Sequence, residues 1–376
     1  TQAAKDFTAI GTAAKIGDAM RVGRTGFDFG FSLLQGIPIL GLATSKLLTG
    51  SVKEAGNLYK AWGTSTKQGF KVLFQKESME TFMAEAAQKQ ITIIENGEAV
   101  TKSLLQAFVD NGGALGRKAT DIYAGLDNSI FTKSVNETLT KGKKQITDQT
   151  LRRFEDSYTH ASDVLRLKGF EAMYTTASKT DDGLRGLTNF LNKSTGALNP
   201  LEAGISPSQQ QIERAFLFFS PRYTRASFSL LADVFNGGLR SNEARSSLIG
   251  TAAFGLGTYI AMSEALGQEP DLDPRSGSFL QVKIGDDRVG IGSFWRSFTK
   301  AAVKIGDSTF TEEDIMEEGV LRQFYNYFAG RGSPVTGLAR DMWNGTNFLG
   351  QEFEDKGDYL KHIGTQFSPF WLENLM

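Results

Sequence analysis

The sequence contains no cysteine and only two histidines, His160 and His362, among its 376 residues. The lack of cysteine excludes disulfides, thiolate nucleophiles and cysteine metal sites. Two histidines far apart in the sequence leave little material for a histidine zinc site or a Ser-His-Asp triad. His160 falls in a long amphipathic pattern, where a lone histidine is more often structural than catalytic. We therefore expect no metal and no cofactor.

An excess of charge is also missing, because 41 Lys and Arg residues are balanced by 42 Asp and Glu residues. Broad binding to naked nucleic acid depends on a basic surface, so this balance argues against it, although a local basic patch for packaged DNA remains compatible. Proline is scarce at 8 residues, whereas there are 28 phenylalanines and 41 glycines. Phenylalanine supplies apolar contact area and glycine permits close approach of backbones. This combination favours tightly packed helices, or helices assembled against other subunits.

Catalytic motifs are absent as well. The segment from Gly112 to Thr120 lacks the spacing of a phosphate-binding loop, and no strand pattern precedes it. The sequence contains no nucleophile elbow, no H-E-x-x-H and no dinucleotide fingerprint. The pair Asp286 and Asp287 is typical of turn chemistry rather than of a metal site. We expect that the protein is not an enzyme.

Helical periodicity dominates the rest of the chain and predicts a mainly α fold, a bundle-like assembly of many helices with one small β-hairpin. We divide the chain into a helical N-terminal region at 1–110, a polar-to-amphipathic helical region at 111–205 and a C-terminal helical region at 206–376. The Gly, Pro and Ser residues up to Pro207 mark the last boundary.

Two apolar segments stand out. No charge occurs between Asp28 and Lys46, and Gln35, Gly36 and Pro38 interrupt this run. The pattern predicts an apolar helical hairpin over 26–50, a buried helix, a turn and a second buried helix.

The second apolar segment spans 248–266, and its small residues favour close packing of another helix: Gly250, Ala252, Ala253, Gly255, Gly257 and Ala261. Transient membrane contact through 26–48 and 248–266 is the alternative to burial in both cases.

Alternation of apolar and polar residues around Gly285 predicts a β-hairpin over 279–291, with Val282 and Val289 on one face. A lone hairpin is marginal in water, so this face is expected to pack on helices or on another chain. The Asn96-Gly97 dipeptide is compatible with a second hairpin or with a helix that ends at Gly97.

Aromatic and basic side chains gather at a helix start, after the predicted hairpin and in the C-terminal tail. Ser220 is a predicted N-cap with Pro221 at the first helical position, and Arg222 and Arg225 follow one turn apart. Two arginines at that spacing suit a phosphate or carboxylate, or salt bridges to neighbouring helices. The candidate interaction residues are Phe218, Phe219, Pro221, Arg222, Tyr223, Arg225, Phe294, Trp295, Phe370 and Trp371.

Several short motifs follow one another in a fixed order: Arg24-Thr-Gly-Phe-Asp-Phe, Leu34-Gln-Gly, Phe190-Leu-Asn-Lys, Phe218-Phe-Ser-Pro-Arg-Tyr, Asp273-Pro-Arg-Ser, Val282-Lys-Ile-Gly-Asp, Arg331-Gly-Ser-Pro-Val and Asn347-Phe-Leu-Gly. In this order the chain resembles, over about 21–355, the C-terminal region of the large polyvalent proteins of bacteriophages. These are very large polyproteins that resemble virion-packaged internal or ejection proteins, often with enzymatic domains upstream. The motifs are structural, so no catalytic residue is carried over.

The resemblance implies a non-enzymatic structural protein inside the particle of a tailed bacteriophage, delivered to the host envelope or cytoplasm at infection. Its expected partners are copies of itself and other phage structural proteins at the portal, the tail entry or the inner core. One alternative is a packaging module of an injected enzymatic polyprotein, of the antirestriction or virion RNA polymerase type. The other is a helical membrane-associated protein.

Overall fold

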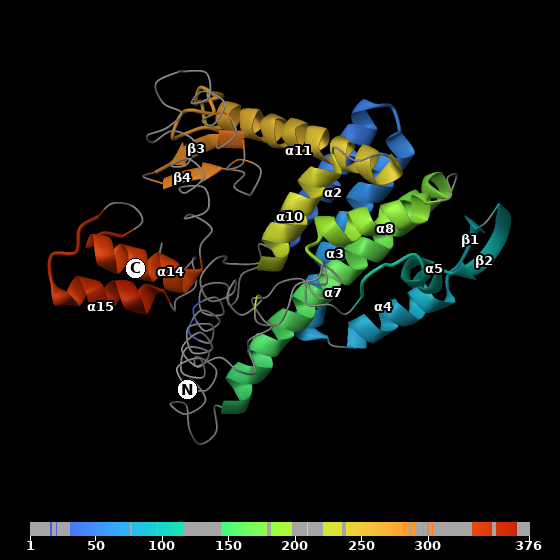
Figure 1. The fold of residues 1–376 in the computed structure, drawn as a ribbon, viewed down its shortest axis with the longest axis horizontal. Coiled ribbons are helices and arrows are strands. Elements are labelled where there is room, and N and C mark those ends of the chain that lie inside the picture. Colours follow the sequence, from blue (N-terminus) through green and yellow to red (C-terminus); the bar gives the residue numbers. More distant parts are fainter. Residues whose placement is uncertain are drawn as a thin grey trace.

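The structure is a computed structural model that describes residues 31–75, 77–95, 97–115, 144–178, 182–197, 221–234, 238–285, 287–290, 333–347 and 351–366, with a few single residues elsewhere. Helices dominate these ranges, which confirms the predicted mainly α class (Figure 1). The helices are α2 (Phe31–Leu48), α3 (Val52–Phe74), α4 (Glu77–Gln88), α5 (Leu104–Asp110), α7 (Lys144–Ala177), α8 (Gly183–Ser194), α10 (Pro221–Asp233), α11 (Gly238–Ala265), α14 (Pro334–Asn344) and α15 (Lys356–Thr365).

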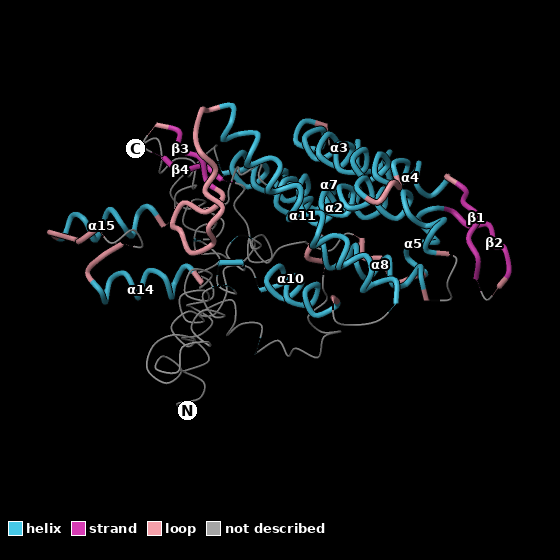
Figure 2. The backbone as a smooth tube through the Cα atoms, turned by 90° about the horizontal axis from the view of Figure 1, so that it is seen from above, coloured by secondary structure: helices cyan, strands magenta, loops and turns pink. Residues whose placement is uncertain are grey.

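Four antiparallel strands complete the described part, as two separate hairpins. Strands β3 (Gln281–Ile284) and β4 (Asp287–Gly290) form the hairpin predicted at 279–291, with Val282 opposite Val289. Strands β1 (Gln90–Glu95) and β2 (Glu98–Ser103) form a second one, so the hairpin interpretation of Asn96-Gly97 holds and the fold has more than the single hairpin expected. Figures 1 and 2 show the two hairpins far apart, with the helical bundle between them.

Helix α2 is the centre of the bundle, with α3 packed on one side and α11 on another. It is one continuous helix, whereas the sequence predicted a turn between two helices at 26–50. Pro38 lies inside α2 and removes a backbone donor, at a cost of about 3 kcal/mol. Burial of successive turns, including Ile37, Ile39 and Leu42, outweighs this cost because packed neighbours cover both sides.

Helix α7 is the longest described helix, and its 34 residues span about 50 Å. It packs along α3, whose buried face consists largely of small residues such as Ala61, Ser65 and Gly69. Small side chains shorten the distance between two helix axes. The Ser157 hydroxyl of α7 consequently donates a hydrogen bond to the backbone oxygen of Gly69, at 2.6 Å.

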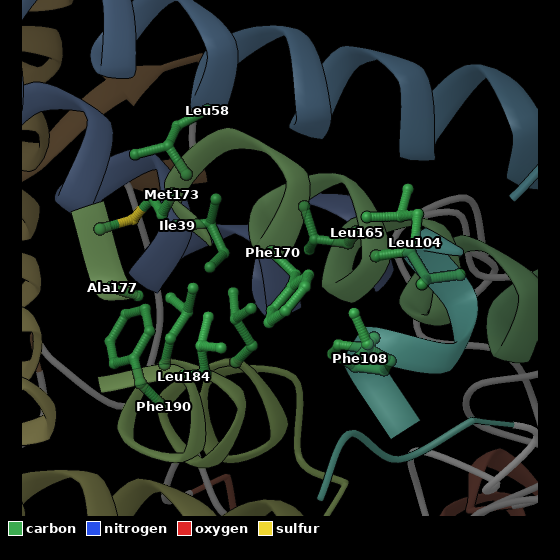
Figure 3. Packing of buried hydrophobic residues seen from close by; sticks show 14 of the residues in the cluster. Ile39, Leu58, Leu104, Phe108, Leu165, Phe170, Met173, Ala177, Leu184 and Phe190 are labelled. Carbon is green, nitrogen blue, oxygen red and sulfur yellow. The ribbon is translucent and has the colours of Figure 1, made fainter. Parts of the chain in front are cut away.

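The hydrophobic core lies where α2, α3, α5, α7 and α8 meet (Figure 3). Phe108 of α5 and Phe170 of α7 touch edge to face, with ring centroids 5.5 Å apart. Phe190 of α8 is fully buried in the same cluster. The composition indicated that phenylalanines would pack between helices, and these three lie in one continuous core.

Candidate interaction surfaces

The two apolar segments of the sequence lie in α2 and α11, and these helices cross at close range. A β-carbon placed on Gly250 would lie 1.7 Å from the backbone oxygen of Gly41, so only glycine allows this contact. Next to it, the Ser247 hydroxyl donates to the backbone oxygen of Pro38 at 2.6 Å. Two other glycines of the same apolar segment, Gly255 and Gly257, have open space around them. The close approach that the small residues of this segment predicted therefore occurs at Gly250.

An ionic junction joins α2, α3, α7 and α11 beside this crossing. The Lys46 ammonium lies 3.2 Å from a Glu243 oxygen and 3.4 Å from a Glu54 oxygen. The Thr176 hydroxyl of α7 donates to Glu54. Burial raises the pKa of Glu243 above its ordinary value, and the nearby Lys46 opposes that rise. Glu243 is therefore a desolvated carboxylate, and the charge of Lys46 stabilises its ionised form.

A second polar seam runs along the buried side of α7. The Arg166 guanidinium is fully buried, pairs with Asp163 one turn earlier and donates to the Thr195 hydroxyl at 2.8 Å. Thr195 is the C-cap of α8, and Lys193 in the last turn of α8 contacts Asp233 of α10 at 2.6 Å. The Arg166–Thr195 hydrogen bond and the Lys193–Asp233 ion pair link neighbouring elements, and because buried charges are costly to unpair, these contacts fix how the helices align.

His160 lies on α7 one turn before Asp163 and is fully buried. Neither ring nitrogen has a hydrogen-bond partner, and the ring packs edge-on against Phe82 of α4 at 5.6 Å. Desolvation lowers the pKa of His160 to about 4. The sequence predicted a structural histidine, and the structure places it in the core, where it is uncharged near neutral pH.

The loop between α11 and β3 contains the motif Asp273-Pro-Arg-Ser. The Asp271 carboxylate accepts hydrogen bonds from the hydroxyls of Ser276 and Ser278, and the Ser276 bond contributes most to lowering the pKa of Asp271. The backbone N–H of Asp271 donates to the Tyr259 hydroxyl of α11 at 2.6 Å. Arg296 donates to the backbone oxygen of Phe279, also at 2.6 Å. The polar groups of this loop are thus used to hold its own shape.

Several apolar side chains remain on the surface. On α11, Ile249 is 64% exposed and Leu256 is 40% exposed, and the exposed Ala252 between them gives the spacing of one helix face. On the C-terminal helices, Trp343 of α14 is 90% exposed and Leu360 of α15 is 70% exposed. Apolar area of this kind on helices favours contact with another protein surface.

The candidate interaction residues chosen from the sequence are only partly within the described structure. Pro221 is the first residue of α10, as predicted, and Arg222 and Tyr223 follow in that helix. Arg225 is half-buried on the same helix and already engaged in an interaction within the chain. The phenylalanine and tryptophan candidates lie outside the described residues: Phe218, Phe219, Phe294, Trp295, Phe370 and Trp371.

The remaining expectations concerned metal binding and membrane contact. Among the described residues, no cluster of three or more His, Asp or Glu side chains is arranged to hold a metal ion. Within the same part of the chain, no helix combines the length and the apolar character needed to cross a bilayer, and this includes α2 and α11. What the described side chains provide is packing, buried ion pairs and exposed apolar helix faces.

Comparison of the chain with protein-family models, with curated proteins and with solved structures gives no match.

Proposed function

We propose that this chain is a non-enzymatic structural protein of a tailed bacteriophage virion. It would be an internal or ejection protein that forms homo-oligomers near the portal or tail entry and is delivered to the host at infection. The observation that carries the proposal is the shared order of short motifs that resembles the C-terminal region of large polyvalent phage proteins. The chain offers no catalytic motif that points elsewhere.

The places of these motifs in the fold support the proposal. In Phe190-Leu-Asn-Lys, the first two side chains fill the core, Asn192 bonds to the backbone of Gly112 and Ala114, and Lys193 pairs with Asp233. The motif at 273–276 lies in a loop closed by its own hydrogen bonds. Both motifs maintain structure, as a structural protein requires.

The exposed apolar faces are the second support. Contiguous exposed apolar residues often mark contacts with other protein surfaces, and α11 presents Ile249, Ala252 and Leu256 along one face. Neighbouring subunits or a surrounding shell would cover such a face, and closed symmetric assemblies are the usual way in which identical chains do so. The near-neutral net charge suits a protein that shares a particle with packaged DNA without binding it irreversibly.

The decisive experiment is a mass-spectrometric inventory of purified virions of the phage that encodes the chain, combined with the length of the full gene. The proposal expects peptides of this chain inside the particle, in multiple copies, and cross-links to portal or tail proteins. Absence of the chain from intact virions would refute it.

A fused-reporter experiment separates the proposal from the packaging-module alternative. The chain is fused to a reporter protein and expressed during infection. If the chain is only a packaging signal, the reporter enters virions while particles assembled without the chain still eject their genome. If the chain is structural, its deletion leaves particles that fail in assembly or ejection.

A further inference from the structure

The hairpin of β1 and β2 leaves both of its outer edges without a partner strand among the described residues. Glu95 lies opposite Glu98 across a two-residue turn, so these two residues form the hydrogen-bonded pair that closes the hairpin. Hydrogen-bonded and non-hydrogen-bonded pairs alternate along an antiparallel ladder. Gln90, Thr92 and Ile94 therefore direct their backbone N–H and C=O groups outward from β1.

Before Glu95, the sequence of β1 lacks the charged residues and prolines that usually protect an edge strand. From Gln90 to Ile94 the sequence is Gln-Ile-Thr-Ile-Ile, with no charge, no proline and a high β-propensity. Ile91 and Ile93 pack into the core, whereas the Ile94 side chain is 44% exposed. Figures 1 and 2 both show the hairpin at the periphery, beyond α5.

We infer that β1 pairs antiparallel with β1 of a second copy of this chain, so that the two hairpins form one four-stranded sheet. The two-fold axis passes beside Thr92, which lies opposite the same residue of the other copy. Gln90 then faces Ile94 of the other copy, and all three of these outward-directed positions obtain backbone hydrogen bonds. The inference rests on the strand geometry and holds whether or not the chain belongs to a virion.

Charge and burial select this register over its neighbours. On the face that packs on the helices, Ile91 lies opposite Ile93, and Lys89 lies opposite Glu95 of the other copy. Both charges also have a partner within their own chain, Lys89 with Glu171 and Glu95 with Lys102, so they extend existing ion pairs. A shift of the two-fold axis by one residue in one direction would set Ile91 against Glu95, and in the other direction Ile93 against Lys89. Each shift would place a charge against an apolar side chain on the buried face.

The edge of β2 fits a second copy less well. Its strand, Glu98–Ser103, carries Lys102 next to its last residue, and Lys102 already pairs with Glu95 and Asp110. Lysine within an edge strand is a common protection against pairing. We therefore place the contact on β1.

Cysteine cross-linking tests the register directly, because the chain has no cysteine of its own. Two residues in a hydrogen-bonded antiparallel pair have α-carbons about 5.5 Å apart, which lies within the range of a disulfide. Thr92→Cys is expected to give a covalent dimer under mild oxidation that disappears on reduction. Ile94→Cys alone is expected to give no covalent dimer, whereas a mixture of Ile94→Cys and Gln90→Cys chains cross-links. Thr101→Cys, at the position across the hairpin from Thr92, is the matched control and is expected not to cross-link.

Proline substitution tests the backbone hydrogen bonds. The N–H of Thr92 points away from β2, so Thr92→Pro removes a donor that only the second copy uses. We expect the dimer dissociation constant, measured by sedimentation equilibrium, to rise about tenfold or more. Thr101→Pro removes an equivalent outward donor from β2 and should leave the dimer unchanged, and circular dichroism checks that both variants fold.

An edge contact of this size is weak in solution, so cross-linking and sedimentation are both needed. Equal cross-linking of the Thr92 and Thr101 cysteine variants would overturn the inference, as would a Thr92→Cys chain that never forms a dimer. Cross-linking between Thr92→Cys and Ile94→Cys chains would overturn the register. None of these outcomes bears on whether the chain is packaged into virions, so the two proposals fail independently.

Discussion

Gly41 and Gly250 lie in contact where α2 crosses α11, and neither position has room for a β-carbon. A β-carbon on Gly41 would meet the Thr251 hydroxyl at 2.1 Å and the backbone oxygen of Ser247 at 2.5 Å. Backbone atoms cannot yield as a flexible side chain does. The contact between α2 and α11 therefore requires glycine at both positions, because glycine has a hydrogen atom where other residues have a β-carbon.

We predict that Gly250→Ala destabilises the fold by about 2–4 kcal/mol, because the methyl group must push α2 away from α11. The matched control is Gly257→Ala on the same helix, where no neighbouring atom lies within 4 Å of the added carbon. That change should stabilise the chain by up to about 1 kcal/mol, because alanine has the higher helix propensity. Urea unfolding of both variants gives the two free energies. Equal effects at the two positions would show that the crossing is looser than the structure indicates.

The Lys46 junction predicts a strong asymmetry between its members. Lys46→Met leaves Glu243 buried and without its cation, and we expect a loss of about 3–5 kcal/mol in the free energy of unfolding. Glu243→Gln removes the buried charge, and Lys46 keeps Glu54 as a partner, so its cost should be much smaller.

The double variant Lys46→Met with Glu243→Gln should recover most of the stability lost in Lys46→Met, since it no longer buries an unpaired carboxylate. Denaturant melts at pH 7 complete the double-mutant cycle. Additive effects of the two substitutions would contradict the pairing.

His160 predicts a loss of stability in acid. Its pKa in the folded chain is lowered to about 4, from an ordinary value of 6.5. Because the folded state disfavours the protonated ring, the contribution of this group is complete above pH 6.5 and is lost as the pH falls towards 4. The total loss is on the order of 3 kcal/mol.

His160→Phe keeps a ring against Phe82 but cannot be protonated. Its free energy of unfolding should fall less than that of the parent chain between pH 7 and pH 4, and the difference between the two curves isolates the histidine. Parallel curves for the two proteins would mean that His160 is not desolvated in solution.

The apolar face of α11 formed by Ile249, Ala252 and Leu256 is exposed. We therefore predict that polar substitutions on it weaken oligomerisation much more than they destabilise the fold. Ile249→Glu with Leu256→Glu should lower the free energy of unfolding by no more than about 1–2 kcal/mol, because Ile249 is mostly exposed and Leu256 is 40% exposed. The same variant should sediment as a smaller species than the parent chain wherever the parent oligomerises.

Ala261→Glu changes an exposed position of the same helix that lies outside the face formed by Ile249, Ala252 and Leu256, and it serves as the control. A parent chain that is monomeric at all concentrations, or a control that dissociates as readily as the double variant, would argue against this face as a subunit contact.

Local pattern predicted much of the described fold. The alternation around Gly285 predicted β3 and β4, and Pro221 predicted the start of α10. These features depend on neighbouring residues, whose preferences are readable without the rest of the chain. The Asn96-Gly97 dipeptide left hairpin and helix open, because a turn signal alone does not say which element it ends.

The long-range contacts could not be predicted from neighbouring residues in the sequence. Pro38 and Gly36 favoured a break in the chain, yet α2 continues through both because α3 and α11 cover it. Nothing in the local pattern distinguished Gly250, which is packed, from Gly257, which is open. The pairs Lys46 with Glu243 and Arg166 with Thr195 join residues from distant parts of the sequence, and only the folded chain brings them together.

The sequence by itself determined the helical class, the hairpin near Gly285 and the exclusion of cysteine chemistry, because composition and short-range periodicity are enough for each. The tertiary structure decided which glycine permits a helix crossing, which charges are buried and which apolar faces remain exposed. Those properties depend on what lies across the interface from a residue, and the order of residues along the chain does not contain that information in readable form.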